Sequence, residues 1–78
     1  MHDDLMAQTI EESSALTLAF NQELHAQGID RSDISSTQLI KIHVQFDAWA
    51  LAQRKKARLE VCFDLYTKSY DVVVIAQN

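Results

Sequence analysis

Three histidines and one cysteine are the residues whose side chains could bind a metal ion or act as a nucleophile. His2, His25 and His43 are scattered along the chain, and no two of them have the spacing that places metal ligands on one helix face. Cys62 has no second cysteine to pair with and lies among apolar neighbours, which favours a small buried hydrophobe over a reactive thiol. We therefore expect no catalytic, cofactor-binding or metal site, and we interpret the protein as a non-enzyme.

A basic run at residues 54–58 could neutralise the phosphates of a nucleic acid. It holds Arg54, Lys55, Lys56 and Arg58, whereas residues 1–30 carry acidic side chains and no lysine or arginine. In a helical hairpin the acidic arm would lie opposite the run, and surface charge pairs would then explain it. The net charge of −4 also argues against nucleic acid, because such binding depends on phosphate neutralisation. A nucleic-acid binder that uses this run is kept as the second alternative.

Length and composition indicate one small cytoplasmic domain, residues 1–78. Hydrophobic residues make up 47% of the chain, which argues against disorder. No uncharged apolar run reaches the ~18 residues that a membrane-spanning helix needs. The first residues are acidic, where a secretory signal would be basic, and no apolar block follows them. We therefore expect no membrane span and a location in the cytoplasm.

A first helix is expected to cover about residues 4–27. The sequence contains no proline and a single glycine, Gly28, so long stretches lack any residue that must break a helix. Apolar residues recur at roughly helical spacing before this glycine. Gly28 then suits the left-handed conformation that closes a helix, and a polar turn is predicted over residues 28–35.

A second helix is predicted to begin at residue 36 and to run to about residue 70. Ser35 and Gln38 have the spacing of a capping box, and Ile34 and Leu39 stand at the hydrophobic-staple positions. No later residue forces the helix to stop. The remaining tail, residues 71–78, is either the end of this helix or a short strand, because consecutive β-branched residues prefer extended structure.

The predicted fold is therefore all-α, an antiparallel helical hairpin of coiled-coil type whose second arm is the longer one. The first arm ends opposite about residue 60, so the apolar side chains beyond that point have no cover within the hairpin. Burying five of them is worth on the order of 8–15 kcal/mol. Either the tail folds back over the hairpin as a third short element, or another chain covers these side chains.

The expected function is protein–protein interaction, as a regulator, an inhibitor or a co-chaperone. We expect a homo-oligomer or a specific protein partner to cover the uncovered apolar side chains. The predicted interface residues are Phe46, Trp49, Leu59, Cys62, Phe63, Tyr66, Tyr70, Val73 and Ile75.

The order of these features resembles the needle subunits of bacterial type III secretion systems. The residues that carry the resemblance are Leu39-Ile40-Lys41, Phe46, Trp49, Val72 to Ile75, Gln77 and Asn78. The resemblance implies a self-assembling filament subunit, exported without a cleaved signal, with the tail as the polymer contact and the last two residues near the lumen. The sequence departs from the family at residues 32–35, which lack prolines, and in its heavier basic run. A filament subunit is the first alternative function.

Overall fold

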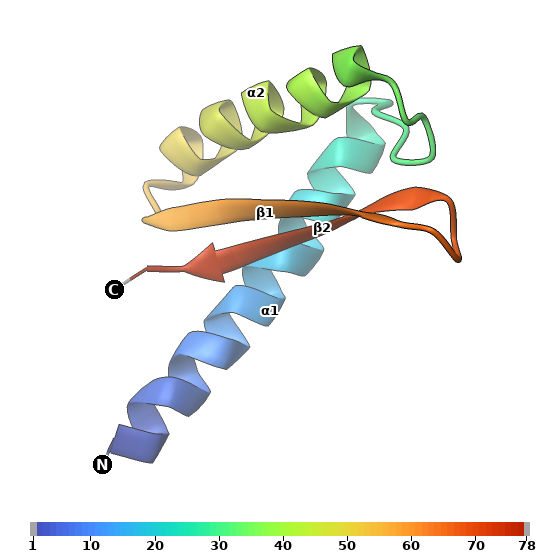
Figure 1. Ribbon diagram of the computed structural model, residues 1–78. Coiled ribbons are helices and arrows are strands. Elements are labelled where there is room, and N and C mark those ends of the chain that lie inside the picture. The colour runs from blue at the N-terminus through green and yellow to red at the C-terminus, as the bar shows by residue number, and fades with distance from the viewer. Residues whose placement is uncertain (1, 78) are drawn as a thin grey trace.

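Two helices and a two-stranded antiparallel sheet form the structure, a computed structural model that describes the backbone of residues 2–77 and the side chains of residues 9–77. The order along the chain is α1 (His2–Ala26), α2 (Ser36–Gln53), β1 (Ala57–Asp64) and β2 (Ser69–Ala76). The helices diverge from their connection, and the strands lie across the opening between them (Figure 1). The fold is therefore α+β, and the predicted all-α class is wrong.

The prediction of one long second helix over residues 36–70 fails because α2 ends at Gln53. Arg54 takes a left-handed backbone conformation (φ 54°), and its N–H donates to the carbonyls of Ala50 and Leu51. Beyond this cap, apolar and polar residues alternate along residues 57–61, and this period of two buries one face of a strand. With strands in its second half, the chain is neither a helical hairpin nor a coiled coil.

Short polar side chains of the 27–35 connection set the start of α2. The Ser35 hydroxyl accepts from the N–H of Gln38 at 3.2 Å, as an N-cap does. The N–H of Ser35 donates to Asp33 Oδ1 at 3.0 Å, so Asp33 supplies the acceptor that Gln38 would supply in a full capping box. Earlier in the connection, Asp30 Oδ1 accepts from the hydroxyl and the N–H of Ser32. These bonds lower the pKa of Asp30 below its usual 3.8.

The two strands pair in one continuous register, from Ala57 opposite Ala76 to Asp64 opposite Ser69. Asp64 also holds the turn between the strands, because its Oδ1 accepts from the N–H of Tyr66 at 2.8 Å and of Thr67 at 3.4 Å. The apolar tail is thus a strand, one of the two forms expected of it. Because residues 57–64 form a strand, the β-branched residues of β2 have a strand to pair with. This pairing explains why the tail is extended and not helical.

The core lies between one face of the sheet and the two helices. Phe20 of α1 is at its centre, with its ring centroid 5.3 Å from those of Phe46 and Trp49 in α2. The strands fold back over the helices as a third element, so the tail covers the core within the chain. The buried hydrophobic side chains are Leu16, Phe20, Leu24, Ile42, Phe46, Trp49, Val72, Val74 and Ala76.

Candidate protein interface at the open edge of the sheet

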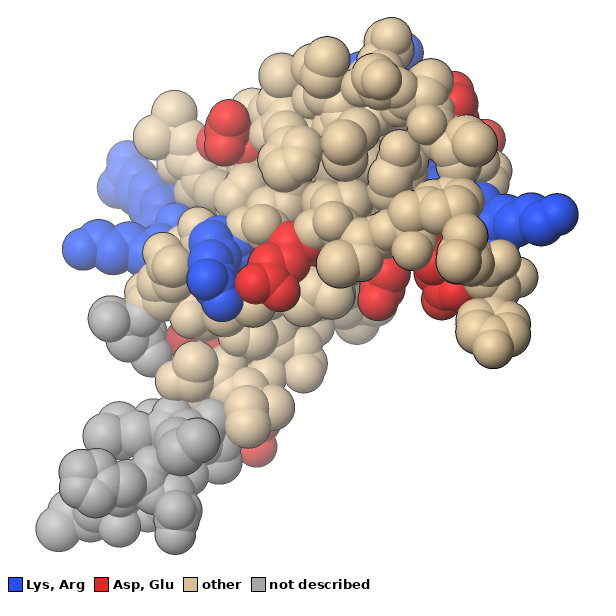
Figure 2. All heavy atoms as spheres, in the orientation of Figure 1, with Lys and Arg blue, Asp and Glu red and all other residues tan. Residues whose placement is uncertain are grey.

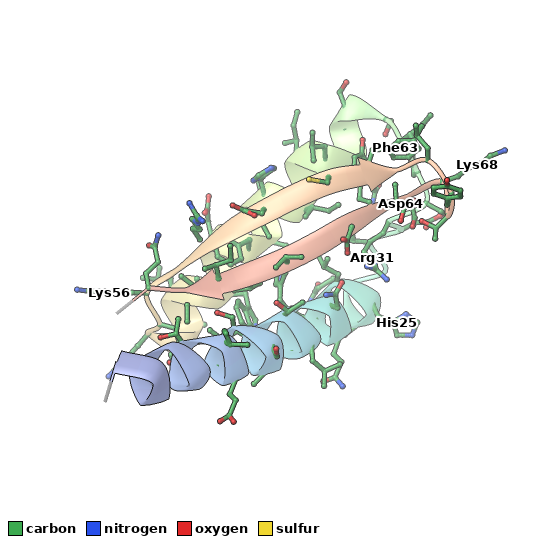
Figure 3. All side chains as sticks on the ribbon, turned by 60° about the horizontal axis from the view of Figure 1, so that its bottom comes forward. His25, Arg31, Lys56, Phe63, Asp64 and Lys68 are labelled. Carbon is green, nitrogen blue, oxygen red and sulfur yellow. The ribbon has the colours of Figure 1, made fainter. Side chains whose placement is uncertain are left out.

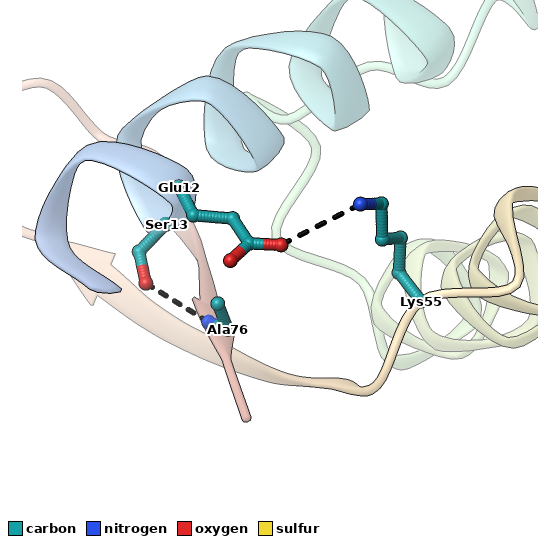
Figure 4. Close-up of polar contacts among 4 residues, drawn as sticks. All are labelled: Glu12, Ser13, Lys55 and Ala76. Atoms are coloured by element: carbon teal, nitrogen blue, oxygen red, sulfur yellow. Dashed lines mark hydrogen bonds and ion pairs between the residues drawn. The ribbon is translucent and has the colours of Figure 1, made fainter. Parts of the chain in front are cut away.

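One edge of the sheet, the outer side of β2, is closed by side chains of α1. Ser13, Thr17 and Asn21 are four residues apart, so they line one face of the helix. The Thr17 hydroxyl donates to the carbonyl of Val74 at 3.0 Å and accepts from the N–H of Val74 at 2.9 Å. Ser13 Oγ accepts from the N–H of Ala76 at 2.9 Å (Figure 4). Together they occupy hydrogen-bonding positions that another strand would use.

The same row continues toward both ends of β2. Asn21 Nδ2 donates to the carbonyl of Val72 at 3.3 Å. At the start of the strand, the N–H of Tyr70 donates to the carbonyl of Arg31 at 2.8 Å, in the connection before α2. Figure 3 shows α1 running beside β2, with Arg31 near the start of that strand. The outer edge of β2 is thus covered from Tyr70 to Ala76.

The other edge, the outer side of β1, is open. In an antiparallel pair, two residues that lie opposite one another behave alike. Both direct their N–H and C=O groups toward the other strand, or both direct them away from it. Val74 and Val72 direct theirs outward to α1, so their partners Leu59 and Val61 direct theirs away from β2. Within residues 2–77 the sheet has no third strand, and no helix side chain hydrogen-bonds to these groups. We define the open edge as the outward N–H and C=O groups of Leu59, Val61 and Phe63.

The side chains of β2 are also more deeply buried than those of β1. Val72 and Val74 of β2 are 1% and 0% exposed, whereas their partners Val61 and Leu59 are only partly buried. Phe63, at the far end of the open edge, is 40% exposed and packs edge-on against Tyr70 at a centroid distance of 5.7 Å. The hydrophobic layer under β1 is therefore incomplete.

Apolar side chains also stand free at the tip of the hairpin. Leu65 is 80% exposed and Tyr66 is fully exposed, directly after the end of the open edge. We define the tip cluster as Phe63, Leu65 and Tyr66. Tyrosine and phenylalanine are enriched at protein interfaces, where their rings supply a large apolar contact area.

The outer face of the sheet is polar on β1. Every second residue of β1 lies on this face, namely Arg58, Glu60, Cys62 and Asp64. Arg58 Nη2 lies 3.2 Å from Glu60 Oε1. Cys62 is exposed on this face, so the interpretation of it as a small buried hydrophobe is wrong. The period-two pattern of β1 sends this thiol outward, although its sequence neighbours are apolar.

The basic run lies at the bend that leads into β1, where lysine and arginine side chains gather at one end of the molecule (Figure 2). Lys55 Nζ lies 3.6 Å from Glu12 Oε1 of α1, one of the charge pairs that the sequence predicts (Figure 4). Arg58 pairs with Glu60. Asp3 and Asp4 also belong to the acidic arm that is predicted to lie opposite the run, but they are outside the described side chains.

The structure separates the predicted interface residues into three groups. Phe46 and Trp49 belong to the core. Cys62, Val73 and Ile75 lie on the outer face of the sheet, Leu59 and Tyr70 on its half-buried inner face, and Phe63 and Tyr66 in the tip cluster. The predicted interface residues do not include Val61 or the open edge itself, although the alternation along residues 57–61 would have indicated them.

Two other apolar surfaces were also missed. A groove of about 650 Å³ runs between α1 and the outer face of β2, with Ile10, Leu18, Val73 and Ile75 in its lining. On α2, Ile40, Val44 and Leu51 form an exposed stripe on the side opposite the buried residues. Neither surface offers backbone groups to a ligand.

Among the described residues, no three His, Cys, Asp or Glu side chains come together in a group that could hold a metal ion. Of the two helices that the structure describes, neither is long and apolar enough to cross a membrane.

Comparison with protein-family models, with curated proteins and with solved structures finds no match. The residues that carry the resemblance to needle subunits lie in different elements, Phe46 and Trp49 in α2 and Val72 to Ile75 in β2. The apolar tail that carries part of that resemblance is β2, and the second helix ends at Gln53. The filament role is tested by none of these comparisons and stays a prediction.

Proposed function

We propose that this protein is a non-enzymatic interaction module that binds a protein by adding a strand to β1, and so acts as a regulator, an inhibitor or a co-chaperone. The observation that carries the proposal is the contrast between the two edges of the sheet. Side chains of α1 and a backbone carbonyl occupy the outer edge of β2, whereas the backbone groups of Leu59, Val61 and Phe63 face outward from β1 without a partner within the described residues.

An unpaired strand edge is a template for another extended chain, because each added residue pair satisfies backbone groups on both chains. Proteins usually protect such an edge with a proline, a bulge, a very short strand or charged side chains. Of these devices, β1 carries only charges, at Arg58, Glu60 and Asp64. β1 contains no proline, pairs with β2 in one unbroken register and runs from Ala57 to Asp64. This strand therefore has the features of an edge that accepts a partner.

The tip cluster supports the same proposal. Phe63, Leu65 and Tyr66 stand at the end of the open edge and are exposed. A strand added to β1 would pass beside Phe63, so side-chain contact would accompany the backbone pairing. Backbone bonds alone select an extended chain, and contacts of this kind select its sequence.

A proline at position 61 tests the proposal. The N–H of Val61 faces away from β2, so Val61→Pro removes a donor from the open edge and leaves the β1–β2 bonds in place. Val61→Ala is the matched control, because it removes side-chain atoms but keeps the donor. We expect the wild type and Val61→Ala to retain the same protein in affinity capture from the native cell, and Val61→Pro to lose it.

Amide hydrogen exchange locates the contact. In the isolated monomer, the N–H groups of Leu59, Val61 and Phe63 should exchange quickly, and those of Glu60 and Cys62, which face β2, should be protected. The captured partner should slow exchange at the three open-edge positions. A partner that Val61→Pro retains, or that leaves these amides unprotected, would show that the protein binds through another surface.

A further inference from the structure

We infer that the strand added to β1 is β1 of a second copy of this chain, antiparallel, with Val61 opposite Val61 across a two-fold axis. The inference rests on the proposed function, since it names the partner of the same open edge. It is carried by the charge pattern along residues 58–64 and by the closed edges that the resulting sheet would have.

The backbone geometry allows only certain registers. The outward N–H and C=O groups of one copy must face those of the other copy. Each of Leu59, Val61 and Phe63 therefore has to lie opposite one of the same three residues in the second copy. With Val61 at the axis, Leu59 lies opposite Phe63 of the second copy, and residues 58–64 are all paired. The half-buried apolar residues of the two inner faces then meet across the new pair of strands.

The same register brings opposite charges together on the outer face. Arg58 lies opposite Asp64 of the second copy, and Asp64 lies opposite the second copy's Arg58, so the contact occurs twice. Glu60 lies opposite Cys62 of the second copy. These are non-hydrogen-bonded pairs, in which opposing side chains come closest. Asp64 Oδ1 is used by the turn, and within the described residues no hydrogen bond reaches its second oxygen.

Shifted registers are less favourable. Moving one copy by two residues places Glu60 opposite Glu60 in one direction and Glu60 opposite Asp64 in the other, and both place like charges together. A shift of four residues in the first direction places Arg58 opposite Glu60, but it pairs only residues 57–61. In the other direction it places Cys62 opposite Asp64, with no opposite-charge contact. The charges therefore select the register centred on Val61.

The product would be a closed assembly. The strand order would be β2, β1, β1, β2, and each outer edge would be the β2 edge that α1 already covers. No open edge would remain, so the contact would stop at two copies and would not extend into a fibre. A two-stranded sheet, which is marginal alone, would become four-stranded.

A double-mutant cycle on Arg58 and Asp64 tests the register. We expect light scattering and sedimentation to show a concentration-dependent dimer. Arg58→Asp places two acidic residues opposite one another and should weaken the dimer roughly 10-fold or more. Asp64→Asn, which keeps an oxygen for the turn, should weaken dimerisation in the wild-type background but strengthen it in the Arg58→Asp background. An Asp64→Asn effect of the same sign in both backgrounds would overturn the register.

A cross-link gives a second, independent readout. Glu60→Cys places a thiol opposite the native Cys62 of the second copy, at a Cα separation that a disulfide accepts. We expect mild oxidation to give a covalent dimer, with position 60 linked to position 62 in peptide mass spectra. Links from 60 to 60, or from 62 to 62, would identify a shifted register and overturn the proposed one.

The failure of this inference can be told apart from the failure of the proposed function. A chain that stays monomeric at all concentrations overturns the self-pairing, and the Val61→Pro comparison still decides whether another protein uses the edge. A dimer that Val61→Pro leaves intact also overturns it, because the copies would then meet through another surface. Val61→Pro should be monomeric and Val61→Ala dimeric.

Discussion

At the level of single residues, Thr17 does the most to define which edge of the sheet is free. Its hydroxyl is bonded to both backbone groups of Val74, a residue that is fully buried. In the sequence, Thr17 falls among the apolar residues of the first helix and would be placed in its core-facing stripe. The structure instead uses it as a polar cover for the edge of β2.

Thr17→Val should therefore destabilise the protein although it keeps the shape of the side chain. The substitution leaves the N–H and C=O of Val74 buried without a partner, at a cost of about 1–3 kcal/mol for each group. Thr17→Ser is the matched control, because it keeps the hydroxyl and loses only a methyl group. Urea denaturation should show a larger loss of unfolding free energy for valine than for serine. The reverse order would mean that the hydroxyl does not matter to the edge.

At the level of elements, the ends of the helices depend on two residues with positive φ. Gly28 (φ 71°) follows α1 and Arg54 (φ 54°) follows α2. Only the first could be recognised from the sequence, because glycine adopts this conformation without strain and arginine does not. The end of α2 at Gln53 was missed for that reason.

Introducing glycine at position 54 and removing it from position 28 should change the stability of the protein in opposite directions. Arg54→Gly should stabilise the protein by up to about 1 kcal/mol, because it relieves the strained cap of α2. Gly28→Ala should destabilise it by about 1 kcal/mol through backbone strain alone, since a Cβ there would meet nothing within 4 Å. Thermal melts of both variants measure the difference. Destabilisation by Arg54→Gly would indicate that the arginine side chain stabilises this end of the helix.

At the level of the whole molecule, one aromatic cluster joins the elements. Phe20 from α1 contacts Phe46 and Trp49 from α2, and the three rings lie in the same core as Val72 and Val74 of β2. A chain of this size has a small core, typically worth only about 3–5 kcal/mol of net stability. The loss of one large core side chain is of the same magnitude.

Phe20→Ala should therefore unfold most of the population at 25 °C, because truncating a buried phenylalanine costs about 3–5 kcal/mol. Phe20→Leu, which keeps most of the volume, should remain folded with a lower melting temperature. Trp49 is the single tryptophan and is buried, so a red shift of its fluorescence reports the loss of the core. An unchanged cooperative melt for Phe20→Ala would show that the helices and the sheet do not form one unit.

Local chemistry allowed part of this structure to be predicted from the sequence. Gly28 indicated the end of α1, and Ser35 indicated the start of α2, because both act on backbone groups within a few residues. The alternation along residues 57–61 indicates a strand, whereas the absence of helix breakers predicts a continuous helix. The lack of a helix-breaking residue does not favour a helix where apolar residues recur with the period of two that is typical of a strand.

The sequence by itself determined the first helix, its turn and the apolar character of the last residues. Only the tertiary structure decided that those residues form a strand, that Ser13, Thr17 and Asn21 cover its edge, and that the edge of β1 stays open. The physical reason is that helix caps are local, whereas a strand has unsatisfied backbone groups on both sides. What satisfies them lies far away in the chain, or in another chain.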